Sequence, residues 1–167
     1  MKKLFYFLLF LPSLFFTSCE GDQGPPGLDG TNLLGSIFEI NADFSSANDY
    51  REFFNYPSDL EVFETDVVLI YLLEETVSDG NGGFLDVWSL LPQTFFTPDG
   101  ILVYNFDYTF IDVSVFLDSD FDLSLLGPEF TQNQIFRVAV LPADLAQNID
   151  TFNIEAVMNA STFTTID

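Results

Sequence analysis

Apolar side chains recur at every second position in several short segments of this chain, and this period constrains its fold more than any other feature. In residues 38–44, phenylalanine, isoleucine and alanine alternate with acidic and amide residues. Since successive side chains of a strand point to opposite faces, the pattern predicts a strand with one face on a core and the other in water. Residues 67–73 are instead an unbroken apolar run, which is typical of a central strand covered on both faces.

Turn signals separate the remaining segments. The sequence Asp-Gly-Asn-Gly-Gly at residues 79–83 predicts a hairpin, with residues 84–91 as its second strand. A further turn is predicted at Asp99 and Gly100. Residues 142–147 begin with proline and predict a short helix. Other strands are predicted at residues 101–108, 111–117 and 134–141.

Strands of this length and spacing predict an all-β domain over residues 35–167, built as an antiparallel β-sandwich. The alternative is an α+β fold or a small barrel with one or two short helices. Sixteen of the 21 phenylalanines follow residue 18, and with Trp88 they supply a core for one domain of this size. Aromatic residues at alternating positions favour burial; the alternative is an exposed platform that stacks on sugars.

The first residues have the features of a secretory signal. Lys2 and Lys3 precede an apolar stretch over residues 4–16, interrupted by one proline and one serine. This stretch is too short to cross a bilayer core of about 30 Å, which takes roughly 20 apolar residues. We therefore expect residues 1–18 to be a signal peptide.

The sequence Phe16-Thr17-Ser18-Cys19 resembles the lipobox of bacterial lipoproteins, in which the cysteine is acylated and becomes the first residue. A thiolate is the nucleophile that takes the diacylglyceryl group. Cys19 is the single cysteine of the chain, and lipidation explains it better than an unpaired thiol in an exported protein. We expect several acyl chains on Cys19 to hold the protein at a membrane.

Glycine occupies every third position just after this cysteine, at Gly21, Gly24, Gly27 and Gly30. The spacing is that of collagen, although three triplets are too few for a stable triple helix. We expect residues 19–34 to be an extended tether that spans about 30 Å at 3.1 Å per residue. A trimerising collagen stalk is the alternative.

The lipobox cysteine and residues 20–27 together resemble the uncharacterised small lipoproteins of Bacteroidetes-type bacteria that carry a short collagen-like segment. Residues 90–96 and 131–137 look similar to the C-terminal domains of such proteins. The resemblance implies an outer-membrane lipoprotein of the cell envelope and brings no known activity. Glu20 and Asp22 resemble the surface-export signal of that group, so both a surface-exposed and a periplasm-facing position stay open.

Acidic residues dominate the part of the chain after Cys19. All 26 of them lie there, whereas Arg51 and Arg137 are its only basic residues. Binding to nucleic acid depends on Lys and Arg that displace counterions from phosphates, so this composition excludes nucleic acid as a partner. It equally excludes docking on anionic lipids, and it favours association with cations.

The residue types that most enzymes use are missing. The chain has no histidine, and the predicted domain has neither cysteine nor lysine. Ser-His-Asp and Cys-His catalysis, thiolate or imidazole zinc sites and a phosphate-binding loop with lysine therefore cannot be built. Carboxylate pairs are so abundant that none can be singled out, so we assign no catalytic residue and expect no enzyme activity.

One acidic cluster has the spacing of a calcium-binding loop. Asp118, Asp120, Asp122 and Glu129 occupy relative positions 1, 3, 5 and 12, as the oxygen ligands of an EF-hand do. Leu123, however, stands where that loop requires glycine. The alternative is that these aspartates form the wet face of a strand or a sheet edge, where charge blocks aggregation. Calcium is the only cofactor that the sequence suggests, and none is required.

Arg137 lies in a predicted strand of a domain with two cations. Two roles are open: it clamps an anionic ligand, or it pairs with a neighbouring carboxylate. The second role is the more frequent one for an arginine among so many acids.

Two classes of function fit these observations. The first is a membrane-anchored envelope protein that acts as a non-catalytic binding or structural module. The second is a surface-displayed, calcium-assisted adhesion or glycan-binding module, which needs exposed aromatic rings near the acidic cluster. Either class allows a protein or glycan partner, and neither identifies one.

Overall fold

The computed structural model describes residues 34–164 of the 167-residue chain. The predicted signal peptide at residues 1–18, Cys19 and all but the last residue of the predicted tether lie outside the described residues. Residues 165–167 also lie outside them. These predictions about the N-terminal part therefore stay predictions.

Strands make up most of the described chain. They are β1 (Gly35–Ala42), β2 (Arg51–Asn55), β3 (Val67–Ser78), β4 (Phe84–Leu90), β5 (Gln93–Phe96), β6 (Ile101–Tyr108), β7 (Asp112–Ser119), β8 (Gln134–Leu141) and β9 (Ser161–Phe163). The helical segments are short: η1 (Ser46–Asn48), η2 (Leu123–Leu125), α2 (Pro128–Thr131), α3 (Ala143–Ala146) and α4 (Ile154–Asn159).

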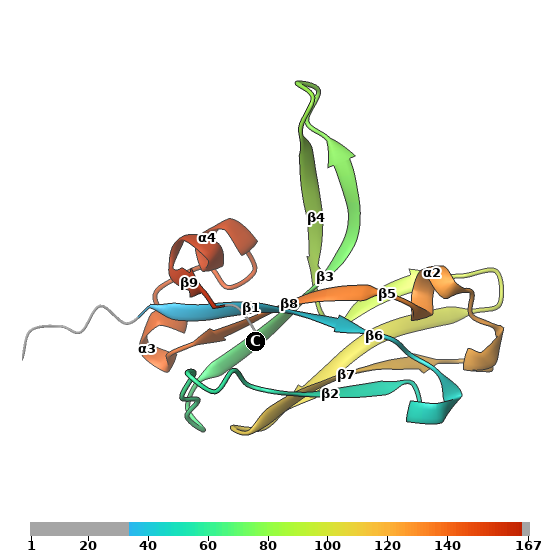
Figure 1. The fold of residues 1–167 in the computed structure, drawn as a ribbon, viewed down its shortest axis with the longest axis horizontal. Coiled ribbons are helices and arrows are strands. Elements are labelled where there is room, and N and C mark those ends of the chain that lie inside the picture. Colours follow the sequence, from blue (N-terminus) through green and yellow to red (C-terminus); the bar gives the residue numbers. More distant parts are fainter. Residues whose placement is uncertain (1–33, 165–167) are drawn as a thin grey trace, which may run out of the picture. The chain divides into compact units, whose positions relative to one another are not determined.

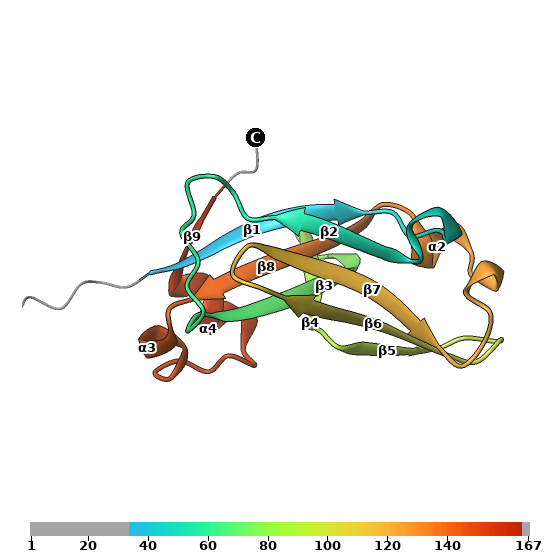
Figure 2. The same ribbon diagram turned by 90° about the horizontal axis from the view of Figure 1, so that it is seen from below.

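The strands form two sheets (Figures 1 and 2). One has the order β4-β3-β8-β1-β9 and the other the order β2-β7-β6-β5. The predicted all-β sandwich is confirmed, but not every pair is antiparallel, because β9 runs parallel to β1. The chain reaches the far side of β1 only after α3 and α4, and a crossover of this kind is what allows a parallel pair.

Most strand predictions agree with the structure to within two residues. The apolar run at residues 67–73 opens β3, which lies between β4 and β8 as expected of a central strand. β6 and β8 have the predicted bounds, and β4 is one residue shorter than predicted. The predicted helix at residues 142–147 is α3, which begins just after Pro142.

Two apolar cores hold the domain together. The larger lies between the sheets and includes Phe38, Ile70, Tyr104, Val115 and Phe136, all at most 2 % exposed. The second lies on the outer face of the β3-β8-β1 region, where Tyr71 and Leu141 are buried together with Val157 of α4. Figure 1 shows both helices at the end of the domain where β9 lies.

The β3–β4 hairpin extends well beyond the sandwich (Figure 1). Its register shifts between Leu73 and Glu75, and the residues beyond this bulge are mostly exposed. The predicted turn at residues 79–83 closes the hairpin: Asp79 Oδ1 accepts the N–H groups of Asn81 and Gly83 at 2.8 Å. This projecting part of the hairpin, residues 75–87, is called the arm below.

The expectation that aromatic residues fill the core is only partly right. Phe38, Phe44 and Phe136 are buried with Tyr71 and Tyr104. Seven phenylalanines are instead exposed: Phe53, Phe63, Phe84, Phe96, Phe110, Phe152 and Phe163. They lie on different strands and loops, and within residues 34–164 no stacked or edge-on ring pair joins two of them.

Candidate binding groove at the open edge of the sandwich

An open groove of about 860 Å³ lies between β2, an edge strand of one sheet, and β9, an edge strand of the other. One wall is formed by residues 53–59, that is, by the end of β2 and the loop after it. The other wall is formed by Thr162, Phe163 and Thr164. The volume is that of a site for a small ligand or a short peptide segment.

The backbone of β2 has one paired and one free side. Leu117 N–H donates to Tyr50 O at 3.0 Å, and Tyr56 N–H donates to Ile111 O at 3.4 Å, so the even-numbered residues of β2 face β7. Backbone groups alternate in direction along a strand. The N–H and C=O groups of Arg51, Phe53 and Asn55 therefore point to the free side.

The same reasoning applies to β9. Gly35 N–H donates to Ala160 O at 3.0 Å, and Thr164 N–H donates to Ile37 O at 2.6 Å, so the even-numbered residues of this segment face β1. Ser161 and Phe163 then direct their backbone groups away from β1. The groove is thus bordered by free backbone groups on both walls.

Gly35 allows β9 to approach β1 closely. A Cβ atom at this position would overlap the Ser161 Oγ and the Leu141 side chain. Ser161 Oγ is buried, and within the described residues it has no hydrogen-bond partner. The pairing between β1 and β9 therefore depends on a residue without a side chain and covers only Gly35–Ile37.

Tyr56 fixes the end of β2 to the sandwich core. Its hydroxyl donates to Thr109 O at 2.9 Å, and its ring meets Phe38 edge-on at 6.3 Å between centroids. Burial raises the pKa of the Tyr56 hydroxyl well above its usual value, and the carboxylate of Asp112 adds to this effect. The hydroxyl is therefore a hydrogen-bond donor at any physiological pH.

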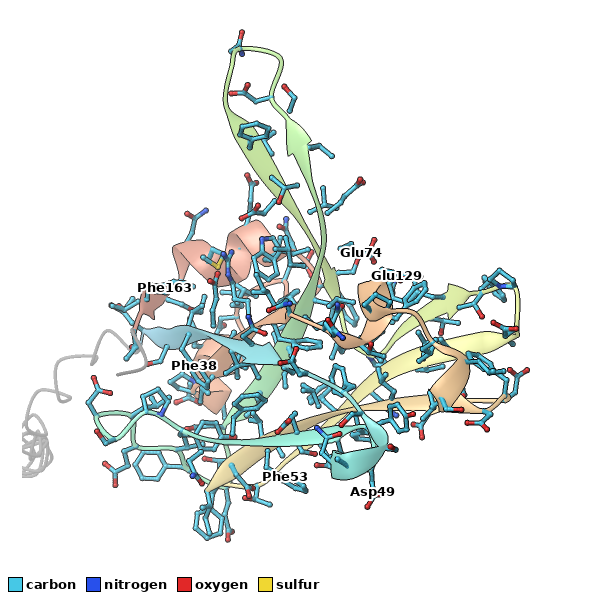
Figure 3. All side chains as sticks on the ribbon, turned by 45° about the vertical axis from the view of Figure 1, so that its right-hand side comes forward. Phe38, Asp49, Phe53, Glu74, Glu129 and Phe163 are labelled. Carbon is cyan, nitrogen blue, oxygen red and sulfur yellow. The ribbon has the colours of Figure 1, made fainter. Side chains whose placement is uncertain are left out.

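The rings of Phe53 and Phe163 belong to the outer faces of the two sheets. Phe53 lies beside Arg51, 5.7 Å from its guanidinium, and Phe163 lies 6.0 Å from the guanidinium of Arg137. In Figure 3 the two rings lie on opposite sides of the buried Phe38. They do not form one aromatic platform, so the groove between them is bordered mainly by backbone and polar groups.

Arg51 is held on the outer face of the β2–β7–β6 sheet. Its guanidinium lies 3.7 Å from the centre of the Phe116 ring and 2.8 Å from Asp107 Oδ2. It also donates to the buried Ser114 hydroxyl, which in turn donates to Asp107 Oδ1. The Ser114 hydrogen bond, with Arg51 as a second partner, lowers the pKa of Asp107.

Arg137 occupies an equivalent position on the other sheet. Its guanidinium lies 4.0 Å from the centre of the Trp88 ring and 2.6 Å from Glu39 Oε1. The prediction that Arg137 pairs with a neighbouring carboxylate is confirmed. Both arginines of the described chain are thus engaged, and neither is directed into the groove.

The acidic residues predicted to bind calcium each have a separate position. Asp118, in β7, accepts from Asn105 Nδ2 at 3.3 Å, and Asp120 accepts the Ile101 N–H at 2.7 Å. Asp122 caps η2 by accepting the Ser124 N–H at 2.9 Å, which lowers the pKa of Asp122. Glu129 lies in the first turn of α2.

These placements bear on both interpretations of the acidic cluster. Within residues 34–164, no group of three or more histidine, cysteine or acidic side chains is arranged to hold a metal ion. The calcium site therefore rests on sequence spacing alone and stays a prediction. Of the four residues, Asp118 lies in a strand, as the alternative of a strand face or sheet edge expects, whereas β7 ends at Ser119 and Asp122 starts a helical turn.

Comparisons with known proteins add no relative. Neither a family model, nor a curated protein, nor a solved structure matches the chain. The resemblance to small collagen-like lipoproteins, which rests mainly on residues 1–30, stays a prediction. In the part of the chain that the structure describes, no helix is long and apolar enough to span a membrane.

Sequence reasoning missed the groove because it missed both of its strands. Arg51–Asn55 reads Arg-Glu-Phe-Phe-Asn, which lacks clear alternation, and Ser161–Phe163 is too short to give a signal. A weak indication did exist in Asn55-Tyr56-Pro57, since proline is tolerated just after an edge strand. The second wall of the groove exists because β9 pairs with β1, and the residues of β9 alone do not indicate this pairing.

Proposed function

We propose that this chain is a lipid-anchored protein of the cell envelope whose β-sandwich acts as a non-catalytic binding module. The anchor is supported by Lys2, Lys3, the short apolar stretch after them and Cys19. The observation that supports a binding role is the groove between β2 and β9, because it is the place where free backbone groups border a cavity of ligand size.

The distribution of functional groups favours binding over catalysis. The groove lacks a cation, since Arg51 and Arg137 are paired with carboxylates on the outer faces. The hydroxyl of Tyr56 stays protonated and donates to a backbone carbonyl. The exposed phenylalanines are dispersed, which favours the binding module over the calcium-assisted, glycan-binding alternative.

Metabolic labelling with a radioactive or alkyne-bearing fatty acid tests the anchor. The full chain should incorporate label and fractionate with the outer membrane, whereas Cys19→Ser should do neither. Ser18→Ala is the matched control, because it leaves the cysteine and a small residue before it. Protease treatment of intact cells, with a periplasmic marker, then separates surface exposure from a periplasm-facing position. Absence of label in the full chain would refute the proposal.

A further inference from the structure

The two ends of the sandwich sheets differ in how their edges are protected. β5, at one edge, has only four residues and lies between Pro92 and Pro98. The neighbouring β4 has a bulged register with β3 and carries Asp86 on its exposed part. Short strands, prolines, bulges and charges are the features that keep an edge from pairing with another chain.

On the opposite side β9 is protected by its length of three residues, whereas β2 is less protected within the described chain. Along β2 the free N–H and C=O groups of Arg51, Phe53 and Asn55 follow one another without a bulge or proline, and Pro57 comes only after the strand has ended. Among residues 34–164, the free side of this strand borders the groove rather than a covering helix or loop. A row of free backbone groups beside a groove is the geometry that accepts an added strand.

We propose that an extended, basic segment of a partner protein adds as a strand to the free edge of β2 and fills the groove. This inference rests on the proposed binding function and names the class of partner. Main-chain hydrogen bonds to Phe53 and Asn55 provide the attachment, and every second side chain of the segment enters the groove toward Tyr56 and the β9 wall.

Charge identifies the partner as basic. Asp59 lines the groove, and the loop that continues from it carries Glu61, Glu64 and Asp66. The described chain offers no unpaired arginine and no lysine to balance them. A second copy of this acidic chain would be repelled, whereas a segment rich in Lys or Arg is attracted.

Short synthetic peptides test the inference on the full, lipidated chain in detergent. The probe set consists of blocked octapeptides in which Lys alternates with Val, Ile, Leu or Phe. The controls are the same peptides with Glu in place of Lys, and fully N-methylated versions that cannot form a strand ladder. We expect the Lys peptides to bind, binding to weaken as salt rises, and the Glu and N-methylated peptides to fail.

A pair of variants locates the site. Asn55→Pro removes the N–H that points to the free side and leaves the hydrogen bonds to β7 intact. Asn55→Ala removes the side-chain amide and keeps this N–H. Binding should fall on the order of tenfold in Asn55→Pro and clearly less in Asn55→Ala, since only the proline removes a main-chain hydrogen bond to the peptide. The Phe53 and Asn55 amides of the unaltered protein should become protected from hydrogen exchange when peptide is added.

Several outcomes would overturn the inference. They are failure of every Lys peptide to bind, equal binding of the N-methylated peptides, and hydrogen-exchange protection at amides other than those of Phe53 and Asn55. Binding of a neutral hexasaccharide but of no peptide would assign the groove to glycans, and a dimer that Asn55→Pro dissolves would assign it to a second copy. If Asn55→Pro fails to fold, the N-methylated peptides still decide. Fatty-acid labelling of Cys19 does not depend on these results, so the proposed anchor and the groove can fail separately.

Discussion

Arg137 donates two hydrogen bonds to Glu39 Oε1, at 3.1 Å from Nε and 2.6 Å from the terminal nitrogen, while its plane lies over the Trp88 ring. The three residues come from β8, β1 and β4, and Glu39 is directly opposite Arg137 in the ladder. A single side chain thus ties three strands together on the face that α4 covers, where Met158 is also in contact.

Replacing Arg137 should therefore destabilise the domain through lost stacking more than through lost charge. We expect Arg137→Met to lower the free energy of unfolding by about 1–2 kcal/mol, because an ion pair with a partly exposed carboxylate contributes little and the largely buried cation over the Trp88 ring contributes more. Arg137→Lys keeps the charge but loses the planar guanidinium, so its free energy of unfolding should lie between those of the native protein and Arg137→Met. Urea denaturation measures all three. A Glu39→Gln variant as unstable as Arg137→Met would show that the ion pair dominates instead.

Gly35 gives a second prediction, about the pairing of β1 with β9. Gly35→Ala should lower the free energy of unfolding by about 1–3 kcal/mol, because the added methyl overlaps the Ser161 Oγ and the Leu141 side chain. Gly127→Ala is the matched control: the three atoms nearest to its methyl all belong to the Glu129 carboxylate, the end of a flexible side chain. Equal effects of the two substitutions in thermal denaturation would contradict this account of β9.

The pKa of Asp107 makes part of the stability depend on pH. Its pKa is lowered in the folded state by the Ser114 hydroxyl and by Arg51. The pKa of Asp107 in the unfolded protein is near 3.8, and above this pH its contribution to stability is complete. The contribution is lost as the pH falls through the lower pKa of the folded protein. The stability difference between the native chain and Asp107→Asn should thus be constant from pH 5 to 8 and shrink below pH 4. In a Ser114→Ala background the difference should be smaller from pH 5 to 8, where Asp107 is ionised in both states.

The sequence was sufficient for the parts of the fold that local patterns determine. Alternation and turn residues predicted β1, β6 and β8 and the turn after β3. In each of these segments the pattern of residue types follows the positions that are buried, exposed or turned. They did not predict β2 or β9. Both are edge strands with one free side, so neither a continuous apolar run nor a clean alternation is required of them.

The candidate site was hidden for the same reason. The predicted ligands Asp118, Asp120, Asp122 and Glu129 are neighbours in sequence, but each carboxylate either has a partner of its own or lies in a separate helical turn. The groove instead joins residues 53–59 with residues 162–164, and its main functional groups are backbone atoms. A binding edge made of backbone leaves no residue type for sequence reasoning to detect.

Calcium binding can be tested directly on the acidic cluster. An ion would have to draw Asp120 away from the Ile101 N–H and Asp122 away from the Ser124 N–H, so we expect a dissociation constant no tighter than about millimolar. Melting temperature in millimolar calcium, with magnesium and a chelator as controls, measures this. A calcium-specific rise that is lost in Asp120→Asn would support the site, and an unmoved melting temperature would dispose of it.

The arm formed by residues 75–87 is expected to open independently of the sandwich. Two strands without a covering layer are only marginally stable in water, and Phe84 and Leu85 are 76 % and 58 % exposed. Val77 and Leu85 form a hydrogen-bonded pair, two residues along from the pair Asp79 and Gly83. Hydrogen exchange at these two amides should be at least tenfold faster than at Ile70 and Leu72, on the same pair of strands but within the core. Replacing residues 76–86 with Asn-Gly places the opposed residues Glu75 and Val87 on either side of a two-residue turn, and it should leave the melting temperature of the sandwich within a few degrees. Slow exchange along the arm in the free protein would mean that it is covered in solution, and concentration dependence of that protection would identify a second copy as the cover.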